Sequence, residues 1–212
     1  MKPVDVLRAE SEAIRIAEQA IESLAFERFC NVVSQLRDSG RKLIVTGVGK
    51  SAIAARKISA TMATVRVPAV FIDPVGLYHG ELGFIIDGDI VLMVSHSGNT
   101  DELIRLLTQL RIVGAELYSL VSDGDSPLGY LENAIITGIE HEAYLMIPTS
   151  SSAAAVAVGD AAAVTVAQMS GFGKDHLTVV HPGGNIGVRL RSSDPRKDAT
   201  PMSHGFRFSD GK

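Results

Sequence analysis

The chain has 212 residues, of which 46% are hydrophobic and only 5% aromatic, so it can bury one large core or two small ones. A formal net charge of −4 gives no basic surface of the kind that binds nucleic acid. The single cysteine, Cys30, excludes an internal disulfide framework, and neither a signal peptide nor an apolar run of about 18 residues is present, so we expect a cytoplasmic protein with no membrane partner.

Residues 4–38 are expected to be helical, because apolar residues recur there at helical spacing while charged residues occupy the other face. Gly40 then ends the helix. Beyond it, apolar runs typical of buried strands alternate with helical patterns. Strands are expected at 42–47, 69–74, 89–94, 115–123 and 133–140. Helices are expected at 48–65, 100–113 and 149–171, with a glycine-rich loop at 75–84 and a turn at 123–132 in which Ser126 or Pro127 starts a short helix.

This alternation predicts an α/β fold, a doubly wound, five-stranded, mainly parallel sheet flanked by helices. In such sheets ligands bind outside the carboxyl ends of the strands. The unusual polar residues of the chain fall at those ends. Residues 191–212 are polar and without periodicity, and we interpret them as a C-terminal tail that is surface-bound or disordered.

The stretch "SHSGNT", residues 95–100, follows the third predicted strand and is typical of an anion site. Ser95, Ser97 and Thr100 can each donate a hydroxyl hydrogen bond, Gly98 allows close approach of the backbone, and a helix beginning near Thr100 adds free N–H groups. A simple helix cap is the alternative, but a cap needs only one hydroxyl. The pattern therefore predicts that a dianion such as a sugar phosphate binds here.

A second glycine-containing turn, "TGVGKSA" at 46–52, follows the first predicted strand. A P-loop is excluded because Ile44 stands where its first glycine is required, and a dinucleotide site lacks the expected acid at the end of the next strand. A tight turn alone accounts for the glycines but not for Lys50 and Ser51. These two residues can bring a cation and a hydroxyl to a ligand phosphate.

The pattern S-x-S-G-x-T after a strand resembles that of the SIS (sugar isomerase) domain. The segments "GVGKSA", "HGELGF", "SHSGNTDEL", "PTSSSAAAVAVGDAAAVTV" and "HPGGNIGVRL" resemble those of the arabinose-5-phosphate isomerases, in the same order, over about residues 40–190. The resemblance implies a single SIS domain over 1–190 with an N-terminal helical segment at 4–38. It also implies a homotetramer with sites at subunit interfaces, no cofactor or metal, and the short form without CBS domains.

The resemblance also implies the site residues. The catalytic set is Lys50, Glu102, Glu140 and His181. The substrate-binding set is Gly49, Ser51, His79, Ser95, His96, Ser97, Gly98, Thr100, Ser150 and Ser151. The chain departs from the family pattern at His96 and Asn99, where the family more often has Asn and Glu, and "EHEAYLMIPTSS" offers Glu142 as a rival to Glu140.

These residue types suit aldose–ketose isomerisation, here of D-arabinose 5-phosphate and D-ribulose 5-phosphate. A carboxylate, Glu102 or Glu140, can move a proton between C2 and C1 through an enediol, while His181 serves ring opening or proton relay and Lys50 contacts an oxyanion or phosphate. Two alternatives stay open: an isomerase for another sugar phosphate, such as a 6-phospho-3-hexulose, and a non-catalytic phosphosugar sensor. The pathway, lipopolysaccharide biosynthesis among others, is also open.

Overall fold

The computed structural model describes residues 1–191. The chain divides into two compact units, Met1–Gly173 and a second unit that begins at Lys174. In its described part the second unit contains two helices, α9 (Lys174–Val180) and α10 (Gly184–Arg191). The predicted C-terminal tail, apart from its first residue, lies outside the described residues.

The first unit contains a five-stranded sheet in which every strand pair is parallel, as predicted. Its strands are β1 (Leu43–Gly47), β2 (Ala69–Phe71), β3 (Ile90–Ser95), β4 (Glu116–Val121) and β5 (Ala134–Ile136). Their order is β2-β1-β3-β4-β5, so the chain leaves β1 in one direction and returns on its other side at β3. That reversal creates a topological switch point between β1 and β3, where sheets of this kind bind ligands.

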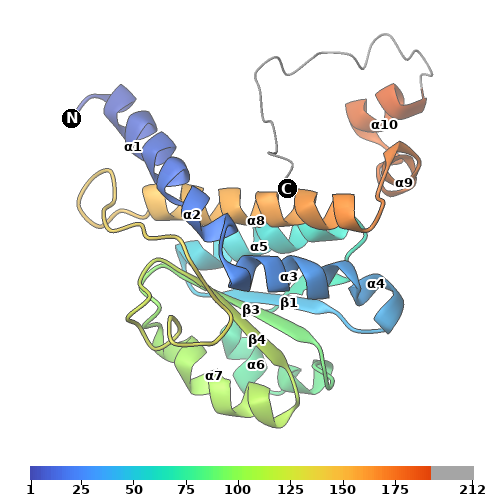
Figure 1. Cartoon of the computed structure of the whole chain (residues 1–212), viewed down its shortest axis with the longest axis horizontal. Coiled ribbons are helices and arrows are strands. Elements are labelled where there is room, and N and C mark those ends of the chain that lie inside the picture. The colour runs from blue at the N-terminus through green and yellow to red at the C-terminus, as the bar shows by residue number, and fades with distance from the viewer. Residues whose placement is uncertain (192–212) are drawn as a thin grey trace, which may run out of the picture. The chain divides into compact units, whose positions relative to one another are not determined.

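Helices cover both faces of the sheet (Figure 1). The helices of the first unit are α1 (Pro3–Ile16), α2 (Glu18–Ile21), α3 (Leu24–Ser34), α4 (Leu36–Ser39), α5 (Lys50–Thr64), α6 (Pro74–Tyr78), α7 (Asp101–Ile112) and α8 (Ser150–Met169). Side chains of each strand alternate between two cores: Leu43 and Val45 pack with α3, α5 and α8, while Ile44 packs with α6 and α7. The strands are therefore buried on both faces, which explains their continuous apolar runs.

The helical segment predicted at 4–38 is four shorter helices rather than one or two. The clearest break is at Ser23, whose hydroxyl accepts a hydrogen bond from the Phe26 N–H and donates one to the Ala20 carbonyl. A serine that bonds its own backbone in this way starts a new helix instead of continuing the old one. The broken segment packs mainly along α8, and α2 and α3 also contact β5.

Two other local predictions need correction. The glycine-rich stretch 75–84 is not a loop throughout, because Asp73 accepts a hydrogen bond from Val75 N–H and caps α6, which is followed by a 3-10 turn at Glu81–Phe84. Conversely, no helix forms at 123–132. The Ser126 hydroxyl donates to the Asp123 carbonyl and accepts from Gly129 N–H, so this stretch consists of hydrogen-bonded turns.

Helix α8 is rich in apolar residues, and Asp160 is its one charged residue. Its 20 residues are long and apolar enough to cross a membrane by length and composition, although the sequence analysis found no apolar run of that length. A buried core helix passes the same test. Much of it is buried against α1, α3 and α5 in the first unit. Val164, on the remaining surface, is 57% exposed.

Candidate functional site

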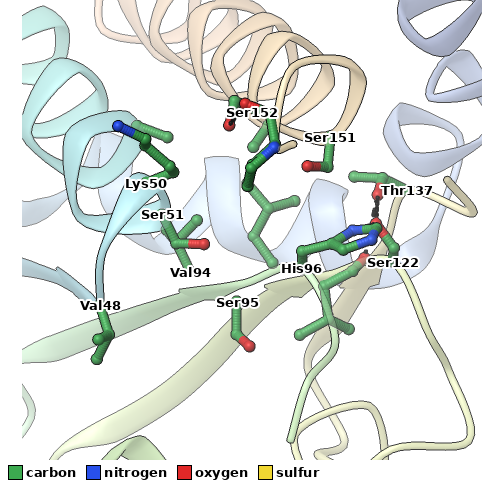
Figure 2. A pocket seen from close by; sticks show the side chains of 15 residues that line it. Val48, Lys50, Ser51, Val94, Ser95, His96, Ser122, Thr137, Ser151 and Ser152 are labelled. Atoms are coloured by element: carbon green, nitrogen blue, oxygen red, sulfur yellow. Dashed lines mark hydrogen bonds between the residues drawn. The ribbon is translucent and has the colours of Figure 1, made fainter. Parts of the chain in front are cut away.

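A cavity of about 180 Å³ lies at the carboxyl end of the sheet, at the switch point between β1 and β3. Its walls come from the β1–α5 turn, the ends of β3, β4 and β5, and the first turns of α8 (Figure 2). The lining residues are Val48, Lys50, Ser51, Ala54, Val94, Ser95, His96, Leu120, Val121, Ser122, Thr137, Pro148, Ser151, Ser152 and Ala155. Most polar groups of the cavity are thus hydroxyls.

The β1–α5 turn brings Lys50 and Ser51 to one wall. Gly47 is required there, because a Cβ at this position would lie 2.9 Å from the Val94 carbonyl oxygen. The tight turn starts α5 directly at Lys50, so its free N–H groups lie beside the same two side chains. A cation, a hydroxyl and a helix N-terminus together favour binding of an anion.

The loop after β3 is braced from within. The Ser95 hydroxyl accepts a hydrogen bond from Gly98 N–H at 3.1 Å and lies 2.8 Å from Thr100 Oγ1, while Ser97 Oγ accepts from Asn99 N–H at 3.2 Å. Ser95 lines the cavity, but Ser97, Gly98 and Thr100 do not. Part of the hydroxyl density that predicted an anion site therefore holds the loop in shape.

His96 occupies the wall opposite Lys50 (Figure 2). Its Nδ1 is 2.8 Å from Ser122 Oγ, which is in turn 2.9 Å from Thr137 Oγ1. The three residues follow β3, β4 and β5, neighbouring strands whose parallel pairing places these positions side by side. His96 is therefore oriented at the cavity by Ser122, which Thr137 holds in turn.

The N-terminus of α8 is covered by Glu142. Its carboxylate accepts hydrogen bonds from the Ser151 hydroxyl and from the backbone N–H groups of Thr149, at 2.8 Å, and Ser151, at 3.4 Å. Burial by itself raises the pKa of Glu142, but these hydrogen bonds and the charge of His96 outweigh burial and hold the pKa below its usual value. Ser150, the first residue of α8, is buried and its hydroxyl has no hydrogen-bond partner among the described residues.

Five of the predicted site residues line the cavity: Lys50, Ser51, Ser95, His96 and Ser151. Glu142, the rival acid, touches Ser151, whereas the Glu140 side chain is 85% exposed and faces His141 at 3.9 Å. The others lie elsewhere in the isolated chain. Gly49 directly precedes α5, Ser150 starts α8, His79 is exposed after α6, and Glu102 is exposed in the first turn of α7.

His181 lies in the second unit, between α9 and α10, so it is not among the residues with which the first unit forms its cavity. Its role stays a prediction, as do those of His79 and Glu102.

Sequence reasoning missed Ser122, Thr137 and Ser152. The first two directly follow β4 and β5, but the strands predicted at 115–123 and 133–140 extended past them, so the rule that identified Ser95 did not reach them. No metal site was predicted, and within residues 1–191 no group of three or more His, Cys, Asp or Glu side chains is arranged to hold a metal ion.

The sequence profile of the SIS domain matches residues 35–165, and the chain belongs to that family. Among curated relatives, arabinose 5-phosphate isomerase KpsF of Escherichia coli O6:H1 is 31% identical over 87% of this chain and 56% of its own length. Arabinose 5-phosphate isomerase GutQ of Escherichia coli K12 is 36% identical over 84% of this chain and 55% of its own length. The chain therefore spans little more than half of these relatives.

A solved structure of an Escherichia coli CFT073 protein in complex with arabinose 5-phosphate is similar along its whole length. It is 28% identical to this chain, covers 86% of it and superposes with a TM-score of 0.72.

Proposed function

We propose that this chain interconverts D-arabinose 5-phosphate and D-ribulose 5-phosphate by 1,2-isomerisation through a cis-enediol. The observation that carries the proposal is the cavity with Lys50 and Ser51 on one wall, His96 on the opposite wall, and hydroxyl groups as most of its other polar groups. The names of the curated relatives and the arabinose 5-phosphate complex of the structural neighbour support the choice of sugar.

The phosphate is assigned to the wall formed by Lys50, Ser51 and Ser95, beside the N-terminus of α5. The positive end of the helix dipole and a lysine both favour a dianion there. Ser97 and Thr100 remain predicted phosphate ligands that would contribute if the loop hydrogen bonds exchanged for ligand contacts. The sugar carbons would then extend toward His96, Ser122 and Thr137.

Of the two acids in the loop before α8, we assign the role of catalytic base to Glu142 rather than to Glu140. Glu142 contacts Ser151 on the cavity wall and is ionised at neutral pH, whereas Glu140 projects into solvent. A base that removes the C2 proton must be ionised and near the substrate. Changing Glu142 to Gln should therefore reduce kcat much more than the same change at Glu140.

We propose further that the protein is a cytoplasmic homotetramer with sites at its interfaces. Apolar side chains of α1, α2 and α8 line a surface groove formed by Ile14, Ala17, Glu18, Ile21, Ala157, Val158 and Ala161. A second subunit would cover this surface and could bring its own His79, Glu102 or His181 to the cavity. A monomer in light scattering at micromolar concentration would contradict this assembly.

Mixing two inactive variants tests whether sites are shared between subunits. Lys50→Ala and His181→Asn should regain part of the activity when combined, because some interfaces would pair an intact Lys50 with an intact His181. Absence of recovery would place the complete site within one chain.

The activity itself is tested on protein treated with EDTA, with a panel of pentose and hexose phosphates. We expect turnover of D-arabinose 5-phosphate without added metal, with deuterium from deuterated water appearing on the carbon that receives the proton. Binding without turnover of any sugar would favour a sensor instead, and turnover of a different sugar alone would reassign the substrate.

A further inference from the structure

A chain of hydrogen bonds selects one tautomer of the neutral His96 ring. It runs from His96 Nδ1 to the Ser122 hydroxyl (2.8 Å), on to the Thr137 hydroxyl (2.9 Å), and ends at the Val121 carbonyl oxygen (3.3 Å). Figure 2 shows the three side chains grouped on the wall away from Lys50. The carbonyl at the end of the chain can only accept a hydrogen bond, and this sets the direction of every bond before it.

Counting protons gives the tautomer. Each hydroxyl has one proton, and that of Thr137 is donated to the Val121 carbonyl. Thr137 must then accept from Ser122, and Ser122, its own proton used, must accept from His96. Nδ1 of His96 therefore carries the ring proton of the neutral imidazole. Among the described residues no group hydrogen-bonds Nε2, so an unprotonated Nε2 is left for a ligand in the cavity.

We propose that His96 is a catalytic proton-transfer residue that carries a proton between the two oxygens of the enediol. In this proposal Ser122 and Thr137 are positioning residues that hold the tautomer with a basic Nε2. The inference rests on the isomerase function proposed above and adds a residue at which the chain departs from the family pattern.

The proton transfers balance without any further reactant. A carboxylate removes the C2 proton of the aldose, which leaves an enediolate with its charge on O1. Nε2 accepts the O2 hydroxyl proton, and the imidazolium then donates it to O1, so that the charge moves to O2. Finally the O2 enediolate becomes the C2 carbonyl as the carboxylic acid returns its proton to C1. His96 and the carboxylate both end in their starting states.

The charges around His96 suit this cycle. Glu142, in the loop before α8, lies near enough for its charge to interact with that of His96 and would stabilise the transient imidazolium. Lys50, from α5, lies on the opposite wall of the cavity. Apart from His96 itself, Lys50 is the charged residue among those that line the cavity.

Nitrogen-15 NMR of the imidazole tests the tautomer without reference to activity. At a pH well above about 6.5, the ordinary histidine pKa, we expect wild-type His96 to carry its proton on Nδ1. The His96→Asn variant identifies the resonances. Ser122→Ala and Thr137→Val should each shift the population toward the Nε2-protonated form. A wild-type ring protonated on Nε2 would overturn the proposal whether or not the protein isomerises a sugar.

Steady-state kinetics test the proton transfer. His96→Asn keeps an amide that can donate to Ser122 but removes Nε2, so kcat should fall by roughly 10²–10⁴-fold while KM changes little. His141→Asn removes a histidine that is 91% exposed and outside this cavity, and should be neutral.

Two results separate the possible failures. If His96→Asn leaves kcat within about threefold of wild type, or changes KM alone, His96 is only a binding contact and the inference fails while the isomerase survives. If the wild-type protein turns over no sugar phosphate, the proposed function fails, and the NMR result still decides the tautomer.

Discussion

The carboxylate of Glu142 accepts hydrogen bonds from both the hydroxyl and the backbone N–H of Ser151. The contact ties the loop before α8 to a residue that lines the cavity, and it satisfies N–H groups that α8 cannot satisfy itself. One side chain therefore stabilises a helix end and places a negative charge beside the site.

Replacing this carboxylate should change the pH dependence of stability. Burial alone raises the pKa of Glu142, but hydrogen bonds from Ser151 and Thr149 lower it more, so the folded-state pKa lies below the unfolded value of about 4.3. A lowered pKa stabilises the fold above the unfolded pKa, and this contribution is lost as the pH falls through the folded pKa. Glu142→Gln should thus cost roughly 1–2 kcal/mol near pH 7 and progressively less below about pH 4.

Urea unfolding at a series of pH values measures the effect. Glu140→Gln is the matched control, since that side chain is 85% exposed and should leave the unfolding free energy unchanged. A constant difference between Glu142→Gln and wild type across the whole series would contradict the pKa argument.

Gly98 should tolerate alanine far less well than Gly40. Both have positive φ, +62° and +74°, but a Cβ at Gly98 would lie 1.9 Å from Ser126 Oγ, whereas nothing lies within 4 Å at Gly40. Gly40→Ala should cost about 1–2 kcal/mol from the backbone alone. Gly98→Ala should cost at least about 2 kcal/mol more, because Ser126 must give up its hydrogen bonds to Asp123 and Gly129. If chemical denaturation gives equal losses of unfolding free energy for the two variants, the loop that contains Ser126 moves freely away from the new Cβ.

Lys42 and Asp89 should matter for stability but not for activity. The Asp89 side chain is fully buried and accepts hydrogen bonds from Lys42 Nζ and from the backbone of Lys42 and Ile86. Both residues precede strands, at the end of the sheet opposite the cavity. Lys42→Met leaves a buried carboxylate without its cation and should cost about 3–5 kcal/mol, with kcat and KM unchanged.

The exposed ion pair between Arg28 and Glu132 provides the comparison for that variant. Arg28→Met should cost no more than about 1 kcal/mol, because both charges are already solvated. A Lys42→Met loss as small as this would mean that water reaches Asp89.

Cys30 should be unreactive in the folded protein. Burial raises the pKa of its thiol to about 12, so almost no thiolate is present at neutral or mildly alkaline pH. A thiol reagent such as DTNB should therefore modify Cys30 at the rate of unfolding, and rapidly in denaturant. Fast modification under native conditions would show that α3 opens locally.

The elements of the sheet follow from local sequence. The first strand is predicted at 42–47 and found at Leu43–Gly47, and the third is predicted at 89–94 and found at Ile90–Ser95. These segments are recognisable because a parallel strand is buried on both faces, so its sequence is a continuous run of apolar residues without alternating polar ones. The breaks inside 4–38 are harder to recognise, because the apolar pattern continues across them and Ser23 alone marks one with a local cap.

The site residues also fall into two groups, those that the sequence predicts and those that only the tertiary structure brings together. The sequence predicts a ligand site at Lys50, Ser51 and Ser95, because they lie at or just after the ends of predicted strands. All three line the cavity. The grouping of His96 with Ser122 and Thr137 depends on β3, β4 and β5 being neighbours in the sheet, and strand order is set by packing between residues far apart in the chain.

The choice between Glu140 and Glu142 also came only from the tertiary structure. The two acids are two residues apart in an irregular loop, where no periodicity tells one face from another. Their environments differ because the α8 N-terminus presents free N–H groups to Glu142, while the Glu140 side chain extends into solvent. The sequence by itself determined the class of fold, the end of the sheet that binds the ligand and the types of residue there. Folding decided which of those side chains meet, because contacts between distant segments depend on the packing of the whole domain.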